Sequence, residues 1–155
     1  MADLRALVAA AGGSGVETYI QSGNVVFEHA QAKDDALRDA LEERIEAAFG
    51  FHVPVVLRRA SSWEAVIRDN PFPDEDPTLL HVVFLRDEPP AGATDGIDRE
   101  RYAPEEFLLK GREVYLYLPN GLGRAKLPPA LTRVIGTPDT ARNWRTVLKL
   151  AALAG

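Results

Sequence analysis

The order of apolar patterns along the first 60 residues constrains the fold more than any other feature of this sequence. Apolar residues at helical spacing predict helices, and short β-branched or aromatic runs predict strands. The predicted helices span 2–11 and 34–49, and the predicted strands span 16–20, 25–27 and 53–57. The resulting order, α-β-β-α-β, is that of a ferredoxin-like βαββαβ unit without its first strand.

The remainder of the chain carries a second, looser arrangement of the same kind. Its predicted elements are a helix at 61–68, strands at 80–85, 106–109 and 114–118, a short helix within 95–101, a helix opened by Pro128 and Pro129 and closed by Gly136, and a last helix at 143–154. Proline suits the first turn of a helix, and glycine suits its end. We therefore predict an α+β protein with two ferredoxin-like subdomains, an incomplete one at 1–60 and a second one at 61–155.

The composition excludes several classes of protein. The chain has no cysteine, which excludes disulfides, thiolate metal sites and cysteine nucleophiles. No stretch approaches the roughly 20 apolar residues of a membrane-spanning helix. We expect a cytoplasmic protein that does not associate with membranes and needs no cofactor.

The charge is distributed unevenly. The net charge of −5 argues against nucleic acid as a partner, because binding to phosphates requires a surplus of basic side chains. Residues 121–155 nevertheless hold six basic residues and one acidic residue. The end of the chain is therefore a basic region on an acidic protein.

A glycine-containing basic loop precedes the helix that the two prolines open. It contains Asn120, Gly121, Gly123, Arg124 and Lys126. Glycines allow backbone N–H groups to approach a ligand, and a helix amino end with nearby cations favours an anion. The pattern is neither a Walker loop nor a dinucleotide fingerprint. The two interpretations are an anion site and a wide turn with solvated cations.

Two further segments contain candidate ligand-binding residues. Arg142 could join Arg124 and Lys126 in one basic pocket, and Asn143 beside it either contributes to that pocket or caps the last helix. Ser22 and Asn24 lie in the turn between the first two predicted strands, where they either serve the turn or line a cleft.

The sequence indicates no catalytic residue and no metal ligand. The three histidines, His29, His52 and His81, do not follow the spacing of a metal site. Tyr19 and Tyr117 are candidates for acid–base chemistry only if they face a pocket rather than the core.

Three stretches of the sequence resemble one protein family. They are MADLRAL at Met1–Leu7, TYIQSGNVVF at Thr18–Phe27, and the PNGLGRAKL and TARNWRTVLKL segments near the end. Together they resemble the bacterial domain-of-unknown-function family 1697. This resemblance implies two α+β subdomains of ferredoxin-like type and implies no activity.

The sequence departs from that family in two places. Family members usually begin upstream with a strand and a glycine-rich turn, and they commonly carry serine where this chain has Ala125. The first strand of a ferredoxin-like sheet is central, so its loss would expose backbone groups and apolar side chains. We therefore expect the chain to aggregate or to fill this gap with another chain.

Three functions remain open at this point. The first is a binding module for a small anionic or nucleotide-like ligand at the basic loop. The second is an enzyme of unknown reaction. The third is a protein-interaction module that uses exposed sheet edges.

Overall fold

The computed structural model describes residues 2–19, 23–30 and 33–155. The chain divides into two compact units, one made of Met1–Ala60 with Lys149–Gly155 and one made of Ser61–Leu148. Both units combine helices with an antiparallel sheet, so the predicted α+β class is confirmed.

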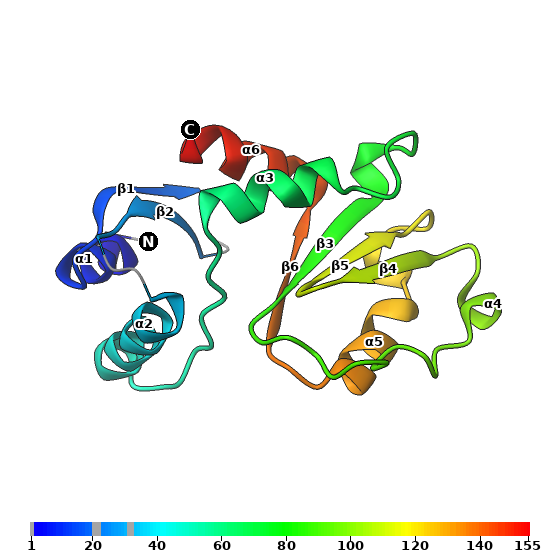
Figure 1. The fold of residues 1–155 in the computed structure, drawn as a ribbon, viewed down its shortest axis with the longest axis horizontal. Helices are drawn as coiled ribbons and strands as arrows, with labels where there is room; N and C mark the ends of the chain where they lie inside the picture. Colours follow the sequence, from blue (N-terminus) through cyan, green and yellow to red (C-terminus); the bar gives the residue numbers. More distant parts are fainter. Residues whose placement is uncertain (1, 20–22, 31–32) are drawn as a thin grey trace. The chain divides into compact units, whose positions relative to one another are not determined.

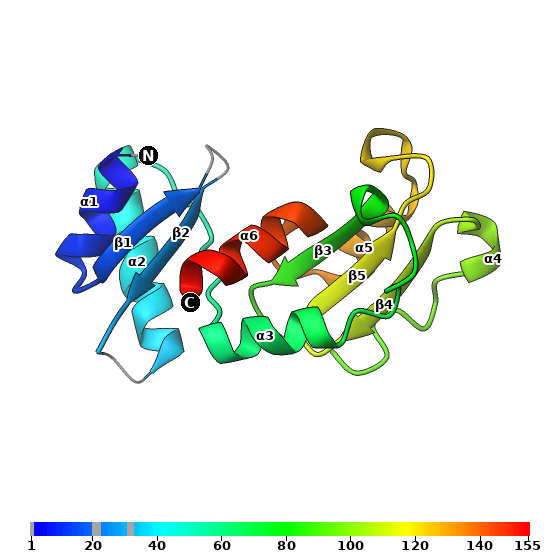
Figure 2. The same cartoon turned by 90° about the horizontal axis from the view of Figure 1, so that it is seen from above.

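The first unit is a β-hairpin with two helices on one face (Figures 1 and 2). Its elements are α1 (Ala2–Ala10), β1 (Ser14–Tyr19), β2 (Asn24–Glu28) and α2 (Asp34–Phe49). The two strands pair antiparallel, as predicted. Every fourth residue of α2 from Leu37 to Ile45 is buried, which explains why the helical pattern was readable from the sequence.

The strand predicted at 53–57 does not form. These residues pair with no strand among the described residues. The Val55 N–H instead donates a hydrogen bond of 2.9 Å to the Glu42 carboxylate, which is buried on α2. Val55 and Leu57 still pack against the core of the first unit. The prediction failed because a strand requires a neighbouring strand, however suitable its own residues are.

The second unit contains a four-stranded antiparallel sheet in the order β4-β5-β3-β6. Its strands are β3 (Leu80–Leu85), β4 (Glu106–Lys110), β5 (Glu113–Tyr117) and β6 (Asp139–Asn143). Its helical segments are α3 (Ala60–Arg68, of which Ala60 belongs to the first unit), the short η1 (Pro77–Leu79), α4 (Arg99–Tyr102), the short η2 (Leu122–Arg124) and α5 (Leu127–Ile135). The last helix, α6 (Trp144–Ala154), belongs to this unit up to Leu148 and to the first unit from Lys149 on. Strand β6 was not predicted from the sequence.

Helices cover both faces of this sheet. Helix α5 lies along one face of the sheet (Figure 1). Its residues Leu127, Leu131 and Ile135 pack there with strand residues such as Val114 and Leu116. On the other face, Trp63 of α3 stacks on Phe84 with 4.5 Å between ring centroids. The Tyr115 hydroxyl also donates a hydrogen bond of 2.7 Å to the Val66 carbonyl oxygen. These contacts anchor β3 and β5 in the interior of the unit.

Candidate functional site

The basic loop connects β5 to α5 by a sequence of tight turns. The Gly121 N–H donates to the Leu118 carbonyl oxygen at 2.9 Å, and Gly121 has a φ of 84°, a conformation that favours glycine. Gly123 and Arg124 then form part of η2. Asn120, Arg124 and Lys126 are exposed. The loop therefore presents its cations to solvent immediately before α5.

The amino end of α5 already holds a carboxylate. Glu105 accepts a hydrogen bond of 3.0 Å from the Leu127 N–H through Oε1. The Lys126 N–H lies 3.2 Å from both Oε1 and Oε2 of the same side chain. The first N–H groups of a helix have no partner within the helix, and the helix dipole favours negative charge there. Glu105 is thus an internal anion at the site that the sequence predicted for an external one.

Sequence reasoning missed Glu105. This residue precedes β4 and is 21 positions away from Lys126, so no local motif joins the two. It also lines a surface groove of about 400 Å³ whose lining includes Arg99, Tyr102, Phe107, Tyr117 and Leu127. A ligand at the start of α5 would therefore have adjoining space beside a largely apolar wall.

Arg142, which was predicted to join Arg124 and Lys126 in one basic pocket, lies on β6. It pairs with Val82, which places it on the sheet face opposite Val83 and Leu116 and hence opposite α5. Its guanidinium donates to the Ala141 carbonyl oxygen at 2.9 Å and to the Thr140 hydroxyl. Burial lowers the pKa of Arg142. Two hydrogen bonds of Arg142 are therefore with residues of its own strand.

Asn143 has a structural role at the end of β6. Its Oδ1 accepts a hydrogen bond of 2.9 Å from the Thr146 N–H in the first turn of α6. The prediction that Asn143 caps the last helix is confirmed, and this cap occupies the side-chain oxygen.

Of the two hairpin candidates, Ser22 lies outside the described residues. Asn24 is buried, with 7% of its surface exposed, and its Nδ2 donates to the Tyr19 carbonyl oxygen at 3.1 Å. This bond ties the two strands together next to the turn. The structure thus gives Asn24 a role in hairpin geometry.

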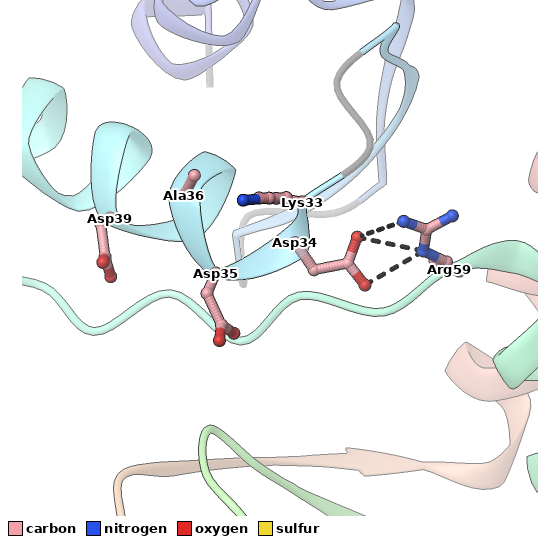
Figure 3. A pocket seen from close by; sticks show the side chains of 6 residues that line it. All are labelled: Lys33, Asp34, Asp35, Ala36, Asp39 and Arg59. Atoms are coloured by element: carbon pink, nitrogen blue, oxygen red, sulfur yellow. Dashed lines mark hydrogen bonds and ion pairs between the residues drawn. The ribbon is translucent and has the colours of Figure 1, made fainter.

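The first unit has an open hollow at the start of α2 (Figure 3). Asp34 and Asp35 lie in the first helical turn, where negative charge is favoured. The Arg59 guanidinium contacts the Asp34 carboxylate at 2.9–3.1 Å, and this hydrogen-bonded contact raises the pKa of Arg59. The pair fastens the segment before α3 to α2 and leaves Asp34 satisfied.

The titratable groups give little support to acid–base chemistry. Tyr117 lines the groove, but partial burial and a hydrogen bond with Glu75 raise its pKa, so it stays protonated near neutral pH. Burial lowers the pKa of His81, whose buried Nδ1 has no hydrogen-bond partner among the described residues. No group of three or more His, Asp or Glu side chains in residues 2–19, 23–30 and 33–155 could hold a metal ion.

Over the same residues, no helix has both the length and the apolar character that crossing a bilayer requires.

Comparison with known proteins identifies a family and no individual relative. The model of a family described as "Protein of unknown function (DUF1697)" matches residues 1–115. No curated protein and no solved structure matches the chain. The family match covers both strands of the first unit as well as β3 and β4, and it ends before the basic loop. Because the match spans well over half of the sequence, the chain belongs to the DUF1697 family of proteins of unknown function.

Proposed function

We propose that this protein is a binding module for a small anionic ligand, which binds at the amino end of α5 by taking the place of the Glu105 carboxylate. The observation that carries the proposal is the pair of N–H groups, from Lys126 and Leu127, that already hold a carboxylate at 3.0–3.2 Å. These donors suit phosphate as well as carboxylate, because both present oxygen acceptors with negative charge.

The charge of the loop supports this assignment. Arg124 and Lys126 are exposed next to the two N–H groups. These two cations would attract a doubly charged anion more strongly than they attract the singly charged Glu105 carboxylate. Lys126 is the central cation of this site, since it supplies both a backbone donor and an ammonium group. The proposed site at the amino end of α5 does not include Arg142.

The test is a thermal melt of the full chain with and without inorganic phosphate. Glu105→Gln removes the internal competitor and should increase the stabilisation by phosphate, whereas Lys126→Ala should reduce it. A ligand at ten times its Kd stabilises the folded state by about 1.4 kcal/mol. Glu88→Gln, exposed in the same unit and outside the groove, is the matched control and should respond to phosphate like the unaltered chain. Equal responses of all four proteins would refute the proposal.

The order of elements and strands in the second unit supports the proposal that this unit has a ferredoxin-like fold. Its order β3-α4-β4-β5-α5-β6 and its sheet order β4-β5-β3-β6, with every neighbouring pair antiparallel, follow the βαββαβ pattern. In this pattern the first strand, here β3, lies between the third and the fourth. The first unit has α1, β1, β2, α2 and the segment 53–57 in the same order as the second to sixth members of this pattern.

A second candidate function, strand acceptance by the first unit, follows from this comparison. The observation that favours it is the segment 53–57, of which Val55 and Leu57 pack on the core although its backbone pairs with no described strand. A strand from another copy of the chain, added along β2, would complete the sheet and give an oligomer.

Sedimentation at several concentrations tests this second candidate. We expect association of the unaltered chain and weaker association of Val26→Lys. Val26 alternates with the core residues Val25 and Phe27 along β2, so the lysine adds charge at the strand edge without entering the core. A chain that stays monomeric throughout would exclude strand acceptance, and it would leave the anion site untouched.

A further inference from the structure

Strand β4 forms one edge of the four-stranded sheet, and Arg99 lies directly against it. The Arg99 guanidinium is 4.0 Å from the centroid of the Phe107 ring, and its Nη1 donates a hydrogen bond of 2.7 Å to the Phe107 carbonyl oxygen. Along an antiparallel strand, the backbone N–H and C=O of one residue bond to the neighbouring strand, and those of the next residue point to the other side. Because the Phe107 carbonyl accepts from Arg99, Phe107 and Leu109 are the residues of β4 that turn their backbone groups away from β5.

The opposite edge is β6, and the hydrogen bonds of β3 show which residues of β6 point outward. The Leu85 N–H donates to the Arg112 carbonyl oxygen, on the β5 side, at 2.8 Å. The Arg86 N–H donates to the Pro138 carbonyl oxygen, on the β6 side, also at 2.8 Å. Residues of β3 therefore alternate between the two neighbours, and Val83, two positions before Leu85, bonds toward β5.

Ala141 of β6 is the register partner of Val83. Because the backbone groups of Val83 bond toward β5, those of Ala141 are not bonded to β3 and point away from the sheet. The Ala141 carbonyl oxygen accepts a hydrogen bond of 2.9 Å from Nη1 of Arg142, whose guanidinium also reaches Thr140. Both edges of the sheet thus have an outward carbonyl oxygen that is held by an arginine side chain. One arginine comes from α4 and the other from the edge strand itself.

We propose that Arg99 and Arg142 are edge caps that prevent the four-stranded sheet from pairing with a second copy of the chain. An uncovered edge presents a row of donors and acceptors that another strand can use. A guanidinium on an outward carbonyl occupies the acceptor. An incoming strand would also have to displace or bury its positive charge, which is costly without a partner for that charge.

The test replaces Arg99 by methionine, which retains an aliphatic stem over Phe107 and removes the donor and the charge. Arg101→Met is the matched control, because Arg101 lies on the same helix with its guanidinium 5.9 Å from the Tyr102 ring centroid and loses the same charge. In sedimentation velocity, we expect the mass of Arg99→Met to exceed that of the unaltered chain at the same concentration, by up to a factor of two at high concentration. Arg101→Met should sediment as the unaltered chain does. Arg99→Lys, which retains the charge without the forked donor, should fall between them and decides the question if the methionine variant does not fold.

Amide hydrogen exchange identifies the edge that associates. In concentrated Arg99→Met, the amides of Phe107 and Leu109 should exchange more slowly than in dilute solution. Arg142→Met should do the same for the Ala141 amide, with the exposed Arg133→Met on α5 as its control. The proposal is overturned if the variants sediment as the unaltered chain does, if their controls associate equally, or if association leaves these edge amides unprotected.

Discussion

The Glu105 carboxylate accepts a hydrogen bond of 3.0 Å from the Leu127 N–H, 22 positions further along the chain. This bond joins the segment before β4 to the first turn of α5, where the proposed anion site lies. Glu105 therefore caps α5, and under that proposal it also competes with the ligand.

Loss of this cap should cost measurable stability. Glu105→Ala should lower the free energy of unfolding by about 1 kcal/mol, as is typical for the loss of a helix cap. Urea unfolding followed by circular dichroism measures the change. Glu106→Ala should be close to neutral, because its exposed side chain lies outside this contact. Equal effects of the two substitutions would show that Glu105 does not cap α5.

His81 should make the second unit less stable in mild acid. Burial lowers the pKa of His81 below its ordinary value of 6.5, although a hydrogen bond with the Leu79 backbone opposes this shift. Well above pH 6.5 the residue is neutral in both the folded and the unfolded chain. As the pH falls below 6.5, the unfolded chain takes up the proton first, so stability decreases until the pH passes the folded pKa and then levels off.

Melting temperatures between pH 8 and pH 5, compared between the unaltered chain and His81→Gln, isolate this contribution. His52→Gln is the control, since His52 is exposed and its Nδ1 lies 3.7 Å from the exposed Glu46 carboxylate. If the His81→Gln curve runs parallel to that of the unaltered chain, His81 does not contribute to the pH dependence.

Tyr115→Phe should destabilise the sheet. The Tyr115 hydroxyl is buried and donates to the Val66 carbonyl oxygen at 2.7 Å, so its removal leaves a buried acceptor without this donor. The expected loss is about 1–3 kcal/mol, measured by chemical unfolding. Tyr102→Phe removes a hydroxyl from a half-buried residue of the same unit and should cost much less. A neutral Tyr115→Phe would mean that water replaces the hydroxyl.

Glu42→Ala should release the segment that follows α2. The buried Glu42 carboxylate accepts from the Val55 N–H at 2.9 Å, and this bond stands where a strand ladder was predicted. We expect faster hydrogen exchange of the Val55 amide, because its acceptor is removed. Glu43→Ala, on the exposed side of the same helix, should leave that exchange rate unchanged. Unchanged exchange in Glu42→Ala would assign the protection of Val55 to burial alone.

The elements with local signals were predictable from the sequence. The spacing of Leu37, Leu41 and Ile45 predicted α2 with its observed ends, and the apolar run Leu80–Leu85 predicted β3. Gly136, with a φ of 70°, ends α5 as its position indicated. In each case the information lies within a few residues of the element itself.

The elements that depend on distant neighbours were not predictable. Strand β6 has the sequence DTARN, which is polar and charged, and it forms because it pairs with β3. The run at 53–57 has strong β propensity, yet it lacks a neighbouring strand among the described residues. The candidate site shows the same limit, since the loop glycines and cations were visible but the Glu105 contact was not.

The most direct test of the anion site is nuclear magnetic resonance of the Lys126 and Leu127 amides during a phosphate titration of Glu105→Gln. We expect saturable shifts of these two amide resonances, with weaker binding in the unaltered chain because Glu105 competes. Shifts that spread evenly over the basic surface without saturating, or resonances of Lys126 and Leu127 that do not move, would contradict the proposed site.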